Sequence, residues 1–204
     1  MQKRRVAIYV FDEAEVLDFA GPFEVFSVTG RRSGEDPFDV YLVAEHGGPI
    51  RARNGFVVVP PYTFANCPPP DILLIPGGYG TRREMHRREP IEWITQVAKD
   101  AELVLSVCSG ALLLAKAGML AGLRATTHHG AAALLQETEP NCTVSMTDRV
   151  VDNGRVVLSA GISAGIDMAL HMVARLHGED VARETATYME YDWAGVSHSL
   201  GSTR

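Results

Sequence analysis

Short apolar runs alternate with longer amphipathic segments along the 204-residue chain. Continuous β-branched and aromatic runs are typical of strands buried on both faces of a parallel sheet. Such runs occupy residues 6–10, 38–44, 71–75 and 103–107, and segments with helical composition occupy 90–99, 131–137, 163–177 and 181–189. This alternation predicts an α/β fold, a three-layer sandwich around a mainly parallel sheet.

Turn residues refine this prediction. Asn54-Gly55 and Asn153-Gly154 each lie between short apolar segments and predict tight hairpins, the first of them off the main sheet. Gly21-Pro22 predicts the start of a helix that runs to about Thr29, because proline suits the first helical position. The proline-rich stretch 62–70 is expected to be loop.

No linker, repeat or low-complexity tract divides the chain, so we expect a single domain over residues 1–204. The tail from about residue 193 is rich in Gly and Ser and is predicted to fray.

The segment Leu103–Ala117, LVLSVCSGALLLAKA, predicts a buried strand that turns sharply into a helix, with Cys108 at the bend. A cysteine between a strand end and a helix N-terminus faces free backbone N–H groups, which favour a thiolate. Such a strand-to-helix turn resembles a nucleophile elbow. The alternative is a cysteine that merely packs in the core.

In open α/β sheets, ligand sites form at the carboxyl ends of the strands. Four such stretches are therefore expected to converge, and they contain Asp18, Gly77-Gly78, Cys108 and Gly161-Ile162-Ser163. Asp18 is either a helix-capping residue or a partly buried acid with a raised pKa beside the thiol. The glycines either serve a turn or offer backbone N–H groups to an oxyanion.

His128 and His129 do not predict a metal site, because adjacent residues rarely point to one ion. One of them is expected to face the thiol pocket. The arginines at 82–83 and 87–88 form a short basic cluster, which is expected to be a solvated face.

Composition limits the classes of partner. The chain has 19 basic and 25 acidic residues and a net charge of −6, which gives no sign of a nucleic-acid or membrane-surface partner. Its three cysteines form no C-x-x-C pair, which argues against a disulfide framework or a thiolate zinc site. Asp12, Glu13 and Glu15 break the first apolar run, so it does not resemble a signal peptide. We expect a cytoplasmic location.

Together these motifs resemble the ThiJ/PfpI superfamily, whose fold is related to class I glutamine amidotransferases. The resemblance rests on VAIYVFDEAEVLDFAGPFEVF, DILLIPGGYG, SVCSGALLLAKAGMLAGLRATTHH and SAGISAGIDMAL. They are most similar to the isocyanide hydratase branch and to the ligand-binding domains of AraC-type regulators.

The resemblance implies a flavodoxin-like sandwich, usually homodimeric, that needs no metal or organic cofactor. It implies that Cys108 is the nucleophile and that Asp18 is the carboxyl group hydrogen-bonded to the thiol. Gly78 and Ser109 would offer oxyanion-type donors, and Ile162 would line the pocket. His128 occupies a position where many members carry a histidine near the cysteine.

Residues within these motifs distinguish the branches. Peptidase-like members carry histidine directly after the nucleophile, whereas this chain has Ser109, which disfavours proteolysis. Glyoxalase-like members normally use glutamate at the acid position, where this chain has Asp18. The resemblance therefore favours hydration of an isocyanide to an N-substituted formamide.

Two alternatives remain open. One is a glyoxalase-like enzyme that acts on 2-oxoaldehydes through a thiohemiacetal on Cys108. The other is a non-catalytic small-molecule or redox-sensing domain similar to those of AraC-type regulators. Those regulators usually continue into a helix-turn-helix region, and no basic recognition helix follows within these 204 residues, which favours an enzyme.

Overall fold

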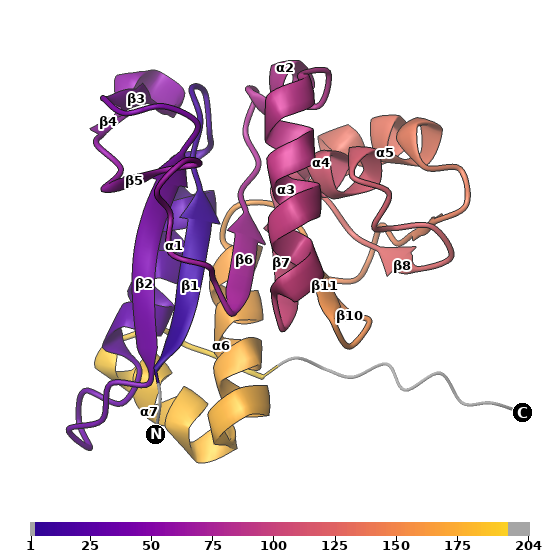
Figure 1. The fold of residues 1–204 in the computed structure, drawn as a ribbon. Helices are drawn as coiled ribbons and strands as arrows, with labels where there is room; N and C mark the ends of the chain where they lie inside the picture. Colours follow the sequence, from indigo (N-terminus) through magenta and orange to yellow (C-terminus); the bar gives the residue numbers. More distant parts are fainter. Residues whose placement is uncertain (1–2, 196–204) are drawn as a thin grey trace, which may run out of the picture.

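The computed structural model describes residues 3–195 as helices packed on both faces of a central sheet (Figure 1). The sheet has the strand order β10-β11-β7-β6-β1-β2-β5. Its strands are β1 (Arg4–Tyr9), β2 (Phe38–Ala44), β5 (Tyr62–Thr63), β6 (Ile72–Ile75), β7 (Leu103–Val107), β10 (Val150–Asp152) and β11 (Val156–Ser159). All neighbours pair in parallel except β10 with β11. The predicted three-layer α/β sandwich is confirmed.

Helices α1 (Val16–Val28), α6 (Ala164–His177) and α7 (Glu179–Tyr188) pack against one another on one face of the sheet. The opposite face carries α2 (Thr81–Glu84), α3 (Arg88–Asp100), α4 (Ala111–Lys116) and α5 (Ala132–Thr138) (Figure 1). The strands β1, β6 and β7 are almost completely buried, as their continuous apolar sequences predict.

Two small sheets lie outside the main one. The Asn54-Gly55 hairpin joins β3 (Ile50–Arg51) to β4 (Val57–Val58) off the main sheet, as predicted. β8 (Arg124–Ala125) pairs in parallel with β9 (Thr143–Val144). The prediction of loop over 62–70 is wrong at its start, where Tyr62 and Thr63 form β5 by pairing with the end of β2.

The predicted start of the first helix is also wrong. α1 begins at Val16, and Pro22 lies buried inside it. A Cβ atom on Gly21 would approach Ile166 of α6 to 2.9 Å, and Pro22 lies within 3.4 Å of the position of a Cβ atom on Gly165. Gly21 and Pro22 thus provide a close contact between α1 and α6, and they do not mark a helix start.

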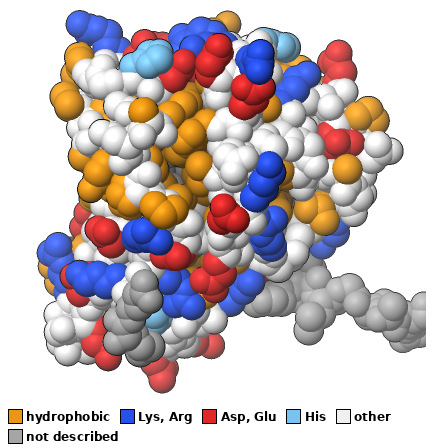
Figure 2. Space-filling model, viewed as in Figure 1, with side chains coloured by type: hydrophobic (Ala, Val, Ile, Leu, Met, Phe, Trp, Pro, Cys, Tyr) orange, Lys and Arg blue, Asp and Glu red, His pale blue; other side chains and the backbone are white. Residues whose placement is uncertain are grey.

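Charged side chains of both signs are interspersed on the face shown in Figure 2, and apolar side chains gather there over β2, β5 and the neighbouring loops. No helix of the described residues is long and apolar enough to cross a membrane. Trp193 is buried against the core, and the rest of the tail predicted to fray lies, from residue 196, outside the described residues.

We predict that Gly110→Ala lowers the free energy of unfolding by about 1–3 kcal/mol, the usual cost of overpacking a dense core. A Cβ atom at this position would lie 2.2 Å from the carbonyl oxygen of Ile75. Urea denaturation measures the effect. Gly47→Ala is the control, because its Cβ atom would meet only Thr63 at 3.9 Å. Equal stability of the two variants would contradict the packing argument.

Candidate active site

Cys108 lies at the predicted elbow, at the start of a 3₁₀ turn (Cys108–Gly110) between β7 and α4. Its φ angle is +58°, a left-handed conformation that costs a non-glycine residue about 1–3 kcal/mol. The amide of Cys108 donates to the carbonyl of Ala160 at 3.1 Å, which ties the elbow to the end of β11. The side chain is buried, with a residue exposure of 6%.

Ile162 follows β11 and also has a positive φ angle, +55°. This conformation is a genuine outlier for a β-branched residue. The amides of Ser109 and Ile162 both hydrogen-bond to the Cys108 sulfur and lower the pKa of the thiol. Two strained segments therefore direct backbone N–H groups at the sulfur, an arrangement that can stabilise negative charge.

Asp18 is completely buried in the first turn of α1. Its Oδ2 atom accepts a hydrogen bond from the amide of Gly77 at 2.9 Å, and no described residue hydrogen-bonds to its buried Oδ1 atom. The carboxyl group lies close enough to the Cys108 side chain for each group to shift the pKa of the other. Burial raises the pKa of Asp18 to about 7, although the interactions with Gly77 and Cys108 act in the opposite direction. A carboxyl group with this pKa both accepts and donates protons near neutral pH.

The pKa of Cys108 does not follow the prediction of a favoured thiolate. Burial, followed by the nearby charge of Asp18, raises this pKa to about 12 despite the two amides. The 3₁₀ turn Cys108–Gly110 leads directly into α4, but the helix N-terminus near the thiol does not offset the effect of burial. Cys108 is therefore a neutral thiol at pH 7, and formation of its thiolate requires a base. Asp18 is the ionisable group in contact with it.

Gly77 is the residue that allows these groups to meet. A Cβ atom at this position would lie 2.5 Å from the Ser109 nitrogen and 2.8 Å from both Asp18 Oδ2 and Cys108 Cβ. Any side chain would therefore separate the acid from the thiol. The paired glycines of the sequence signalled this close approach, but they did not indicate which partner each glycine would meet.

Gly78 and Ser109 contact each other. The Gly78 amide donates to Ser109 Oγ at 3.1 Å, so this N–H already has an acceptor. Thr81 is completely buried, and its Oγ1 atom donates to the Gly78 carbonyl at 2.8 Å and lies 3.1 Å from Ser109 Oγ. The sequence analysis missed Thr81 because α2 is a single turn with no periodic pattern.

His128 and His129 both line a pocket of about 470 Å³ that Ile162 and Ser163 border. Their rings lie 4.1 Å apart. His128 Nδ1 accepts a hydrogen bond from the Gly130 amide at 3.1 Å. Burial, together with His129 and Arg82, lowers the pKa of His128, so its ring is neutral at pH 7 and carries its proton on Nε2.

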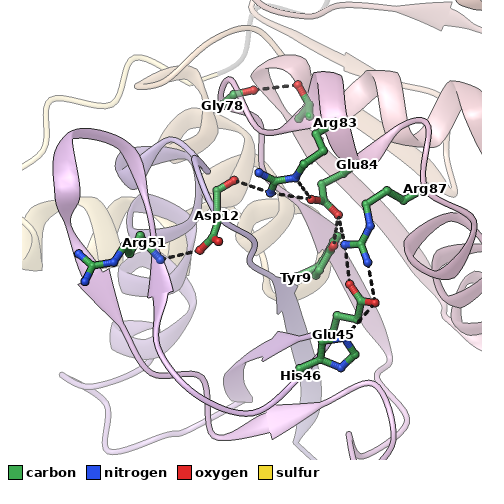
Figure 3. A network of polar contacts seen from close by, with 10 residues as sticks. Tyr9, Asp12, Glu45, His46, Arg51, Gly78, Arg83, Glu84 and Arg87 are labelled. Atoms are coloured by element: carbon green, nitrogen blue, oxygen red, sulfur yellow. Dashed lines mark hydrogen bonds and ion pairs between the residues drawn. The ribbon is translucent and has the colours of Figure 1, made fainter.

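A buried polar network holds α2 in place (Figure 3). Glu84 is 1% exposed and accepts hydrogen bonds from Tyr9, Arg83 and Arg87. Arg87 also pairs with Glu45, which directly follows β2. Arg83 and Arg88 are exposed, as expected of a solvated face, but Arg83 and Arg87 also neutralise a buried carboxylate, which the sequence did not indicate.

Comparison with known proteins identifies the family to which this chain belongs. The DJ-1/PfpI family model matches residues 4–175. The chain belongs to the DJ-1/PfpI family. It is 33% identical to an isonitrile hydratase from Pseudomonas putida over 187 residues, which cover 92% of this chain and 78% of that one.

One further relative is a protein of this family with a solved structure, and another is a transcriptional regulator. A crystal structure of a ThiJ/PfpI family protein from Pseudomonas syringae aligns with a TM-score of 0.84 and 30% identity, covering 99% of this chain and 80% of that chain. The HTH-type transcriptional regulator GbdR of Pseudomonas aeruginosa is 25% identical over 92% of this chain. The chain spans about half the length of that regulator. The family thus includes enzymes and regulators.

Within residues 3–195, no group of three or more His, Cys, Asp or Glu side chains is arranged to hold a metal ion.

We predict that Asp18→Asn stabilises the protein at pH 8 and much less at pH 4. The pKa of Asp18 is about 7 in the folded protein and near its ordinary value of 3.8 in the unfolded chain. The folded state therefore binds the extra proton, and stability from this group falls as the pH rises from about 4 to 7. Each pKa unit is worth about 1.4 kcal/mol.

Thermal unfolding of both proteins across this pH range measures the difference. Asp39→Asn, on an exposed position of β2, is the matched control. A difference between the Asp18 variant and the native chain that does not depend on pH would contradict the raised pKa.

Proposed function

We propose that the protein hydrates an isocyanide, R–N≡C, to an N-substituted formamide, with Cys108 as nucleophile and Asp18 as proton carrier. The observation that supports this most is the buried Asp18 carboxyl group, which lies beside the Cys108 side chain across Gly77. The similarity to an isonitrile hydratase over 92% of the chain is consistent with it.

In the first step, Asp18 as carboxylate accepts the thiol proton while the Cys108 sulfur attacks the terminal isocyanide carbon. The amides of Ser109 and Ile162 face the sulfur and offset the charge that forms during the transfer. Asp18 then delivers the proton to the same carbon. The product of this step is a thioformimidate, R–N=CH–S–Cys108, and Asp18 is a carboxylate again.

In the second step, water adds to the thioformimidate carbon. Asp18 takes one proton from the water and passes it to the nitrogen, which gives R–NH–CH(OH)–S–Cys108. Cleavage of the C–S bond releases R–NH–CHO, and the hydroxyl proton returns to the sulfur. The sum is one isocyanide and one water in, and one formamide out, with the thiol regenerated.

Activity measurements on an aliphatic isocyanide test this proposal. We expect Cys108→Ala to abolish formamide production, and Asp18→Asn to lower kcat about 10²–10⁴-fold, the usual contribution of a positioned acid or base. Because Asp18 acts first as a base and has a pKa of about 7, kcat/KM should fall as the pH drops below 7. Cys142→Ala is the control.

Turnover that survives either site substitution would refute the mechanism. Lactate production from methylglyoxal without formamide production would support the glyoxalase alternative. The similarity to GbdR gives specific support to a sensing role. In that case the purified protein would bind a small molecule at this site without turning over any isocyanide.

We also propose that the protein is a homodimer. Exposed apolar side chains lie at the start of α1, in the β3–β4 hairpin and directly after it: Leu17, Phe56, Val57 and Val59 have exposures of 37%, 50%, 49% and 66%. The rings of Phe19 and Phe56 lie 6.5 Å apart, which joins the two segments. Large exposed apolar patches commonly mark protein interfaces.

If this patch is the interface, Val59→Asp should convert the dimer to a monomer, because the variant would bury an unpaired charge. Sedimentation velocity at micromolar concentration measures the change. Met146→Asp, which places the same charge at another exposed apolar position, is the control. A monomeric native protein, or an unchanged dimer in Val59→Asp, would contradict this proposal.

A further inference from the structure

Arg82 has an unusual environment for a cation beside an active site. It lies on α2, partly buried, and its Nη1 atom donates to the Gly78 carbonyl at 3.3 Å and to Thr81 Oγ1 at 3.2 Å. Its guanidinium lies 5.9 Å from the centre of the Tyr79 ring. No carboxylate of the described residues forms an ion pair with it.

The neighbouring arginines are different. Arg53 pairs with Glu13, Arg83 with Glu84, and Arg87 with Glu45. The chain carries an acidic excess, with a net charge of −6, so acidic partners are abundant. A partly buried cation is stable only when its charge is compensated, and neutral acceptors compensate it incompletely. Arg82 is thus fixed in place while its charge remains available to an anion.

The guanidinium charge of Arg82 lies close to the residues around Cys108. The Gly78 carbonyl that it contacts lies 3.1 Å from Ser109 Oγ, one residue from the nucleophile. Arg82 also influences the ring of His128, which lines the 470 Å³ pocket. Glu15 is the opposing charge in this region, and its influence on His128 is weaker than that of Arg82.

His128 adds a directional donor. Its Nδ1 atom is occupied by the Gly130 amide, so Nε2 carries the ring proton. No described residue accepts a hydrogen bond from Nε2. A guanidinium and a neutral imidazole N–H together form a pair of donors that suits an oxygen anion such as a carboxylate.

We infer that Arg82, with the Nε2–H group of His128, recognises an anionic substituent on the substrate. The substrate class is then an isocyanide that carries a carboxylate, with its carbon at Cys108 and its carboxylate at Arg82. The identity of the reacting group rests on the proposed function. The recognition of the anion by Arg82 does not, and it can be tested separately.

The first experiment compares alkylation of Cys108 by iodoacetate and iodoacetamide, which differ in charge at the same reactive carbon. Mass spectrometry of the Cys108 peptide gives the two rate constants. We expect the iodoacetate-to-iodoacetamide ratio to fall about tenfold in Arg82→Gln, the typical effect of losing one charge-assisted hydrogen bond. Arg82→Lys should retain part of the preference, and added salt should weaken it.

Arg88→Gln is the matched control, because Arg88 lies on the exposed surface of α3 and its loss changes the net charge equally. Cys67 in the same samples reports the intrinsic ratio of the two reagents. A ratio at Cys108 that is the same in the native protein and in Arg82→Gln would overturn the inference, whatever the protein does to isocyanides.

The second experiment compares isocyanoacetate with its methyl ester as substrates. We expect the native protein to prefer the anion in kcat/KM, Arg82→Gln to lose that preference, and the control Arg88→Gln to retain it. Preference for the ester in the native protein would overturn the proposed substrate class. Turnover of neither compound, with a charge-dependent alkylation ratio, would refute the hydratase function and leave the anion site supported.

Discussion

The contact between the Asp18 carboxyl group and the Cys108 thiol depends on the absence of a side chain at Gly77. A Cβ atom there would overlap both groups, since it would lie 2.8 Å from Asp18 Oδ2 and from Cys108 Cβ. Because the acid is completely buried, its charged form is destabilised and its pKa rises to about 7. The same burial keeps the thiol neutral. In the proposed mechanism, the pair passes one proton between two groups that are both difficult to ionise.

The surrounding structure maintains this contact by holding two residues in strained backbone conformations. Cys108 and Ile162 both have left-handed backbone conformations, and such strain persists only where neighbouring contacts enforce it. The Ala160 carbonyl accepts a hydrogen bond from the Cys108 amide. Hydrogen bonds from Gly78 and Thr81 to the hydroxyl group of Ser109 fix the residue that follows Cys108. Glu84, buried among an aromatic hydroxyl and two guanidinium groups, fixes the far end of α2 (Figure 3).

The sequence predicted the fold well because its strands are continuous apolar runs, for which burial in a parallel sheet is the main solution. The strand, elbow and helix of Leu103–Ala117 could be predicted for the same reason, because this segment begins with a continuous apolar run. Local patterns failed where tertiary contacts decide the outcome. Pro22 lies inside α1 because it packs against α6, and Tyr62 is in a strand because the end of β2 is free to pair.

The sequence indicated which residues meet at the site, but it did not indicate their charge states. The carboxyl ends of parallel strands must meet, so Asp18, Gly78 and Cys108 could be placed at one edge of the sheet. The charge state of the thiol depends on burial and on the nearby Asp18 carboxyl group, and neither effect is encoded in a short motif. Thr81 and the unpaired charge of Arg82 depend on the geometry of a single helical turn.

The pH dependence of Cys108 alkylation by iodoacetamide tests most directly whether the thiol reacts through Asp18. A neutral thiol that needs the Asp18 carboxylate should react with a rate that rises through a midpoint of about pH 7. This step should be absent in Asp18→Asn, whose rate should increase only at strongly alkaline pH. A rate that is constant from about pH 6 to 9 and equal in both proteins would reveal a preformed thiolate and would contradict the account.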